Sequence, residues 1–200
     1  MLKERMNEIV SISYDILRNK IIAGGIIIPN EASLQLHFGV VLKQVGQLFE
    51  FSDKDNFSIE LETPQEINSS VKTPKGKARC DISLRLSNAE NSVSAVIELK
   101  HFKKKREDEK NKPTTTNRFS IMKDIENLEK YQENNPNMLC YEILYTDDEG
   151  YSNEKTTAAI KLVGNITQNH TYLGETINLN QAYKTEWIRK GEHHFMMIKF

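Results

Sequence analysis

The stretch "ARCDISLRLSNAENSVSAVIELKHF" (78–102) decides the fold that we expect for this chain. Two runs of alternating apolar and polar residues flank the polar turn "NAEN" (88–91), which is the pattern of a β-hairpin. Because side chains alternate across a strand, each arm should turn one apolar side to a core. The expected apolar sides are Cys80, Ile82, Leu84 and Leu86 in the first arm, and Val93, Ala95, Ile97 and Leu99 in the second.

The length of the turn sets which polar residues meet across the hairpin. A symmetric turn of two or four residues places Ser87 opposite Ser92, and both lengths are common in hairpins. Counting inward from that pair, Asp81 lies opposite Glu98, and Lys100 is the next residue on the same face. A register slip of one residue would instead put the two carboxylates on opposite faces.

Two directly opposed carboxylates repel each other and need compensation. Magnesium would supply it, because this ion is typically held by one or two carboxylates together with water and substrate oxygens. A bound divalent cation lowers the pKa of its water and polarises a phosphoryl oxygen, and a nearby ammonium stabilises developing charge. The alternative is a surface hairpin with cross-strand salt bridges, each worth about 0–1 kcal/mol.

A third acid, Glu31, opens a helix that we predict from its N-cap Asn30 to about residue 49. Its spacing from Leu34 and Phe38 places Glu31 at the edge of the buried stripe of this helix. A carboxylate there needs a partner. Alternatively, Glu31 complements the helix dipole and remains solvated.

The remaining patterns predict an α/β sandwich with a mixed sheet. A helix at 3–20, the helix at 30–49, three strands, a helix and a strand follow one another along the chain. The expected ranges after the second helix are a strand at 56–64, the hairpin, a mobile loop at 107–118, a helix at 119–134, a buried strand at 138–146, and further strands at 156–164 and 193–200.

Composition excludes some classes of function. The net charge is -1, so the overall charge gives no electrostatic attraction toward nucleic acid or an anionic membrane surface. The positive charge is instead concentrated in a run from Lys100 to Lys123, which is either a solvated loop or a phosphate-facing patch. No run of apolar residues is long enough to span a bilayer. The two cysteines lie in apolar, strand-like segments and are expected to be buried, reduced thiols. We therefore expect a cytoplasmic protein.

The hairpin resembles the motif of the PD-(D/E)xK nucleases. The corresponding residues are "RCD" (79–81) and "IELK" (97–100), with sixteen residues between Asp81 and Glu98. One departure is that Cys80, and not the proline of the family name, precedes Asp81. The resemblance implies a restriction-endonuclease-like fold, a three-layer α/β sandwich with a central mixed β-sheet flanked by helices. It implies one nuclease-like domain over 1–200, with a core of about 30–146 and an extra N-terminal helix at 1–20.

The resemblance also implies roles for individual residues. Asp81, Glu98 and the backbone carbonyl of Leu99 would hold Mg²⁺, for which Mn²⁺ could substitute. Lys100 would position the attacking water or help to deprotonate it, and Glu31 would be an additional acid near the metal. The cations Lys103, Lys104, Lys105 and Arg106 would bind the nucleic-acid backbone.

We therefore expect a metal-dependent endonuclease that acts on DNA, and a homodimer would suit cutting of both strands. A second hypothesis is a module that binds nucleic acid or protein on the same fold without cleaving it. A third is an assembly protein that uses the polar hairpin as a subunit contact. Metal-dependent cleavage assays on DNA and RNA separate these hypotheses.

Overall fold

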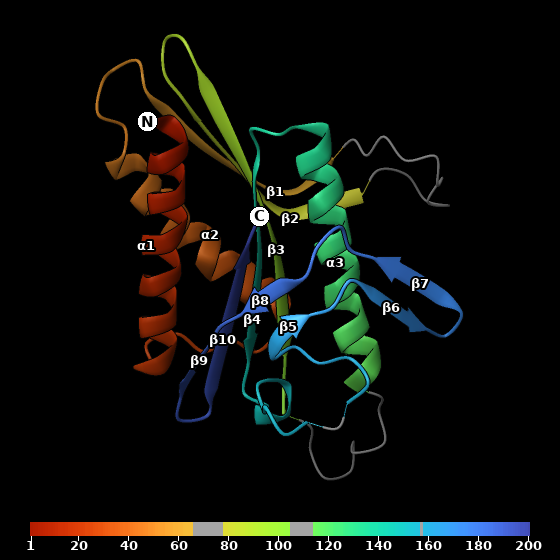
Figure 1. The fold of residues 1–200 in the computed structure, drawn as a ribbon. Helices are drawn as coiled ribbons and strands as arrows, with labels where there is room; N and C mark the ends of the chain where they lie inside the picture. The colour runs from red at the N-terminus through yellow and green to blue at the C-terminus, as the bar shows by residue number, and fades with distance from the viewer. Residues whose placement is uncertain (66–77, 105–113, 157) are drawn as a thin grey trace.

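A computed structural model describes residues 1–65, 78–104, 114–156 and 158–200. It contains three long helices and a central sheet (Figure 1). The elements are α1 (Leu2–Ile22), α2 (Glu31–Leu48), β1 (Asn56–Gln65), β2 (Ala78–Ser87), β3 (Ser92–Phe102), α3 (Thr114–Asn134), β4 (Leu139–Thr146), η2 (Glu149–Tyr151), β5 (Gly164–Ile166), β6 (Asn169–Tyr172), β7 (Glu175–Asn178), β8 (Tyr183–Thr185), β9 (Trp187–Lys190) and β10 (His193–Lys199).

The central sheet has six strands in the order β1-β2-β3-β4-β10-β9. Only β3 and β4 pair in parallel, and the other neighbours in this sheet are antiparallel. A parallel pair needs a crossover, and α3 lies between β3 and β4 in the chain. The predicted α/β architecture with a mixed sheet is thus confirmed, and β5–β8 and β6–β7 form two further small sheets.

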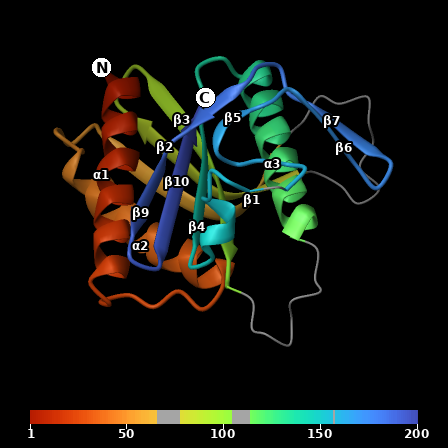
Figure 2. The ribbon, with the colours of Figure 1, turned by 60° about the horizontal axis from the view of Figure 1, so that its bottom comes forward.

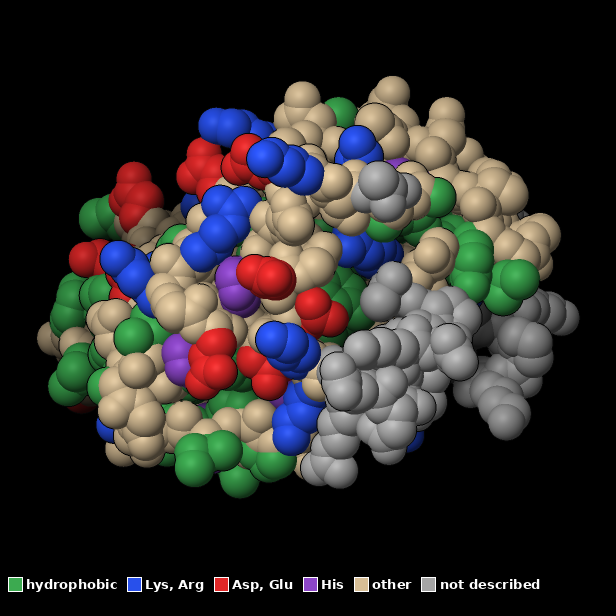
Figure 3. Space-filling model, turned by 90° about the horizontal axis from the view of Figure 1, so that it is seen from below, with side chains coloured by type: hydrophobic (Ala, Val, Ile, Leu, Met, Phe, Trp, Pro, Cys, Tyr) green, Lys and Arg blue, Asp and Glu red, His purple; other side chains and the backbone are tan. Residues whose placement is uncertain are grey.

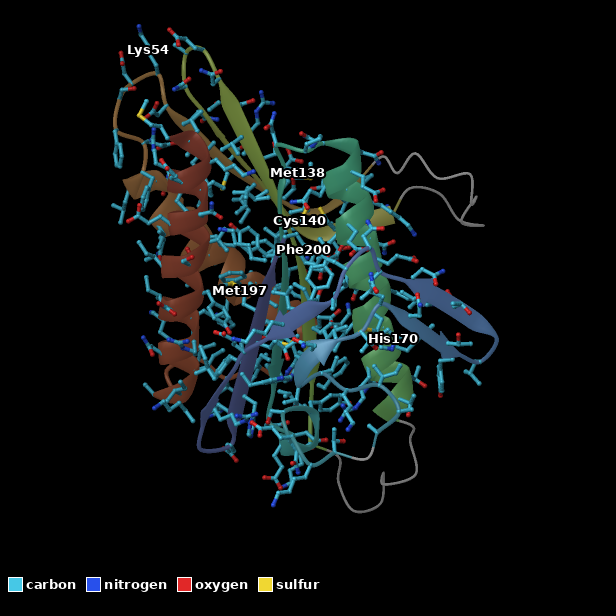
Figure 4. The ribbon with its side chains drawn as sticks, in the orientation of Figure 1. Lys54, Met138, Cys140, His170, Met197 and Phe200 are labelled. Atoms are coloured by element: carbon cyan, nitrogen blue, oxygen red, sulfur yellow. The ribbon has the colours of Figure 1, made fainter. Side chains whose placement is uncertain are left out.

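Helices cover both faces of the central sheet (Figures 1 and 2). On one face, α1 and α2 bury apolar side chains against alternate residues of β2, β3 and β4. On the other face, α3 contributes Leu128 and Tyr131 to a cluster with Val96 and Cys140. Cys140 and Phe200 lie side by side in this layer (Figure 4), and the Phe200 N–H donates to the Cys140 carbonyl at 3.0 Å.

Helix α2 is fixed at both ends. As predicted, Asn30 caps it, and its side-chain oxygen accepts from the Ser33 N–H at 2.8 Å. Near the other end, Gly46 lies so close to β1 that a Cβ atom there would be 2.2 Å from the Phe57 ring. The absence of a side chain at Gly46 therefore sets the distance between α2 and the sheet.

Two sequence predictions need correction. Helix α3 begins at Thr114, so residues 114–118 are helical and not part of the loop expected at 107–118; residues 107–113 lie outside the described ranges. The expected strand at 156–164 is wrong, because the described residues before Gly164 form irregular chain. That chain is nevertheless buried, because Ile160 and Leu162 pack into the core beneath α3.

Other predicted elements are confirmed within one or two residues at most boundaries. The helix predicted at 3–20 is α1, the strand predicted at 56–64 is β1, and the strand predicted at 193–200 is β10. Of the helices in the described part of the chain, none combines the length and apolar character that crossing a bilayer requires.

Candidate active site

The hairpin has the register that its symmetric turn predicts. Ser87 pairs with Ser92, and the regular ladder runs to the pair Ile82 and Ile97. Asp81 is the next residue beyond this ladder, adjacent to Glu98. The Glu98 and Lys100 side chains belong to the face of β3 that carries Val96, and this face is covered by α3.

Asp81 is tied to two other elements. Its Oδ2 accepts a hydrogen bond from the Leu99 N–H at 2.6 Å, which fixes the carboxylate beside β3. Its backbone carbonyl accepts from Gln35 Nε2 of α2 at 2.7 Å. Gln35 also donates to Glu62 Oε1 at 3.0 Å, so α2 holds the backbone at Asp81 and the side chain of Glu62 together.

The regular alternation of β2 breaks at Asp81. Cys80 was expected to share a face with Ile82, but it packs with Val96 beneath α3, whereas Ile82 packs beneath α1 and α2. On β1, the residue facing this break is Glu62, whose φ of 54° interrupts the extended conformation. Glu62 and Asp81 are also missing from the regular β1–β2 pairing, and the Asp81 carbonyl accepts from Gln35 of α2.

The ammonium of Lys100 lies among oxygen atoms from three elements. Its Nζ is 3.0 Å from Asp124 Oδ2 of α3 and 3.7 Å from Glu31 Oε1 of α2. It also donates to the Leu99 carbonyl at 3.2 Å. Glu31 in addition accepts from the His101 N–H at 3.4 Å, so the predicted helical acid does lie at the site.

Two acids of the site, Asp124 and Glu142, were missed at the sequence level. Glu142 of β4 is the parallel partner of Glu98 and is fully buried. Neither of its carboxyl oxygens has a hydrogen-bond partner among the described residues. A signal for both existed in the sequence. Glu142 interrupts the apolar run "MLCYEILYT", and Asp124 lies within the apolar stripe that contains Ile121 and Ile125.

Burial and mutual repulsion raise the pKa values of the acids. Burial, followed by the Asp124 and Asp81 carboxylates, raises the pKa of Glu98 to about 9. Burial also raises the pKa values of Asp81, Asp124 and Glu142. For Asp81, the Leu99 N–H and Lys100 counteract part of this rise.

Lys100 behaves in the opposite way. Burial alone would lower its pKa, but the carboxylates of Asp124, Glu142 and Glu31 outweigh burial and raise it. Lys100 is therefore an ammonium at neutral pH. The four acids Asp81, Glu98, Asp124 and Glu142 carry more potential negative charge than this single ammonium balances within the described residues.

The donors at the site fit a hard divalent cation bound through few protein ligands. Among the described residues, no group of three or more His, Cys, Asp or Glu side chains is arranged to hold a metal ion. Magnesium does not need such a group, since one or two carboxylates with water and substrate oxygens suffice. The adjacent carboxylates of Asp81 and Glu98 and the Leu99 carbonyl are such donors, and the surplus of acids favours a cation electrostatically.

Only two of the four basic residues that were predicted to bind phosphate lie within the described ranges. Lys103 and Lys104 are exposed just beyond β3, whereas Lys105 and Arg106 lie outside the described residues. Acidic, basic and histidine side chains gather on the face of the molecule seen from below (Figure 3).

Arg118, from the same basic run, is not on the surface. It is 3% exposed and donates to the carbonyls of Ile160 at 3.1 Å and Gly150 at 2.5 Å.

Comparison with known proteins identified no relative of this chain. No family model matches this sequence, and no curated protein or solved structure matches the chain.

Proposed function

We propose that this protein is a magnesium-dependent nuclease with a restriction-endonuclease-like fold, and that it cuts DNA internally. One observation carries the proposal: the Asp81 carboxylate, held by the Leu99 N–H, contacts the Glu98 carboxyl group. Lys100, two residues after Glu98 on β3, is close enough to act electrostatically on both. The order of two helices, a hairpin, a crossover helix and a parallel strand agrees with the expected nuclease core.

Each residue has a role that its surroundings support. Asp81, held by the Leu99 N–H, and Glu98 would hold the cation, together with the Leu99 carbonyl. The bound cation would supply an acidic water and charge neutralisation at the phosphate. Glu31, which contacts Lys100 and the His101 N–H, would orient these two residues and not bind the cation directly.

Lys100 would act as a cation and not as a base. Because its pKa is raised, it keeps its proton at neutral pH. An ammonium beside the two metal-binding carboxylates would orient a phosphate oxygen or the attacking water and stabilise charge in the transition state. Lys103 and Lys104 would contact the DNA backbone without reading its sequence.

The test is cleavage of supercoiled plasmid, linear duplex DNA and RNA by the purified protein, with Mg²⁺ or with EDTA. Cleavage of DNA that requires Mg²⁺ is expected. Asp81→Asn, Glu98→Gln and Lys100→Met should each reduce the rate by at least about 100-fold. Glu90→Gln is the matched control, because Glu90 is an exposed acid in the turn of the same hairpin.

Two results would contradict the proposal. Cleavage that persists in Asp81→Asn and Glu98→Gln would point to a contaminating nuclease. Binding of DNA without cleavage under any metal condition would favour the non-cleaving module, and neither binding nor cleavage would favour the assembly protein.

A further inference from the structure

We infer that Asp124 is the positioning residue for Lys100, and that it anchors the Lys100 ammonium in the candidate active site. This inference rests on the proposed function for its catalytic consequence, but its geometric part can be tested without activity.

The contacts of Lys100 suit a positively charged ammonium. Its Nζ forms ion pairs with Asp124 at 3.0 Å and with Glu31 at 3.7 Å. It donates one hydrogen bond to the Leu99 carbonyl at 3.2 Å. These partners come from α3, β3 and α2, so the amine is held between the two helices that cover opposite faces of the sheet.

The three contacts differ in strength. The Asp124 contact is the shortest and joins two opposite charges, and the side chain of Asp124 is 18% exposed. The Glu31 contact is longer, and the side chain of Glu31 is 43% exposed. An incoming phosphate oxygen can therefore replace Glu31 as a partner of Lys100, while Asp124 keeps the amine in place.

The backbone of α3 holds Asp124 at this position. Ile121 and Ile125, on the same side of the helix, are completely buried beneath it. Glu142 does not take the place of Asp124, because among the described residues Lys100 forms ion pairs with Asp124 and Glu31 and none with Glu142. Asp124 is thus the closer of the two described carboxylates that form an ion pair with Lys100.

The first measurement is the reactivity of Lys100 in the metal-free protein. Brief reductive methylation with formaldehyde and borohydride, followed by peptide mass spectrometry, reports how freely this amine reacts. Asp124→Asn, which keeps the size of the side chain, should raise the labelling of Lys100 by at least about fivefold. Glu126→Gln is the matched control, because Glu126 is an acid of the same helix that pairs with Lys130. It should leave the labelling unchanged.

The second measurement is steady-state cleavage. Asp124→Asn should lower kcat by about 10–100-fold with little change in KM, because a misplaced group costs rate more than binding. Asp124→Glu, which restores the charge on a longer side chain, should recover part of kcat. Circular dichroism of each variant shows whether it has folded, and Asp124→Ser, which also removes the charge, serves in place of Asp124→Asn for labelling if the latter does not fold.

The outcomes separate the two claims. Unchanged labelling of Lys100 in Asp124→Asn overturns the anchoring role, and so does a larger increase in Glu31→Gln than in Asp124→Asn. Increased labelling with an unchanged kcat overturns the catalytic consequence. Increased labelling in a protein whose natural sequence cleaves no substrate confirms the anchor and contradicts the proposed function.

Discussion

Glu98 of β3 and Glu142 of β4 are partners in the parallel register, and both lie on the side of the sheet that α3 covers. Two buried glutamates side by side repel each other when both are ionised, and Asp124 increases that repulsion. The stability of the protein should therefore depend on pH and on cations in ways that can be measured.

The first prediction concerns pH in the presence of EDTA. The pKa of Glu98 is raised from 4.5 to about 9, so the folded protein holds a proton that the unfolded chain releases. The stabilisation from that proton is fully present below about pH 4.5 and is lost progressively as the pH rises to about 9. The free energy of unfolding, measured with urea, should fall between pH 6 and pH 9 by an amount on the order of several kcal/mol.

Replacing Glu142 by Gln tests the origin of this pH dependence. Glutamine keeps the size of the side chain and cannot ionise, so Glu142→Gln should make the unfolding free energy less dependent on pH between 6 and 9. Its stability at pH 9 should exceed that of the natural sequence. An unchanged slope would mean that repulsion among these buried carboxylates does not limit stability.

The second prediction concerns divalent cations. Because a ligand that binds only the folded state stabilises it, Mg²⁺ at 100 times its dissociation constant should add about 2.7 kcal/mol at pH 8. Differential scanning calorimetry with Mg²⁺ and with EDTA measures this effect. Asp81→Asn should abolish the increase in Tm, whereas Glu90→Gln should retain it. Equal Tm values with Mg²⁺ and EDTA in the natural sequence would argue against a cation site.

The third prediction concerns two glycines of α2. Gly46→Ala should destabilise the protein by about 1–3 kcal/mol, because the new Cβ would lie 2.2 Å from the Phe57 ring. At Gly39 the nearest atom would be Leu61 Cδ2 at 3.6 Å, an ordinary contact. Gly39→Ala should therefore be neutral or stabilise the helix by up to about 1 kcal/mol. Chemical denaturation of both variants measures the difference, and similar effects would contradict the close packing at Gly46.

The fourth prediction separates the basic residues by role. Arg118→Met should cost about 2–4 kcal/mol of stability, because Arg118 donates to the buried carbonyls of Ile160 and Gly150. Its effect on DNA affinity should be small. Lys103→Ala and Lys104→Ala should leave stability nearly unchanged, lower the affinity for DNA and reduce its salt dependence. Fluorescence anisotropy at several salt concentrations measures both, and a reduced salt slope in Arg118→Met alone would contradict this assignment.

The hairpin could be predicted because its information is local. Alternation gives the faces, and a symmetric turn gives the register, so the pairing from Ser87 and Ser92 to Ile82 and Ile97 followed from counting residues. The N-cap at Asn30 could be predicted for the same reason, because it depends only on neighbouring residues. The same counting failed at Cys80, next to the break in the β1–β2 pairing at Glu62 and Asp81. The positive φ of Glu62 and the Gln35 contact at this break involve segments that lie far away in the sequence.

Local patterns mark Asp124 and Glu142 as unusual acids but do not place them at the site. A continuous apolar strand such as β4 gives no indication of which face a single acid occupies, and only the parallel pairing with β3 places Glu142 beside Glu98. The position of Asp124 depends on how the crossover helix lies across the sheet. The expected strand at 156–164 failed because buried apolar residues there, including Ile160 and Leu162, pack as irregular chain.

The place of β10 in the sheet has a consequence for the protein during synthesis. Strand β4 pairs with β3 on one side and with His193–Lys199 on the other, so half of its backbone partners are made about fifty residues later. Until that segment leaves the ribosome, β4 is an open edge with unpaired amide groups, and Glu142 lies on it. A nascent chain therefore carries Glu142 on an incompletely paired strand, and the site should reach its final geometry only after β10 has been made.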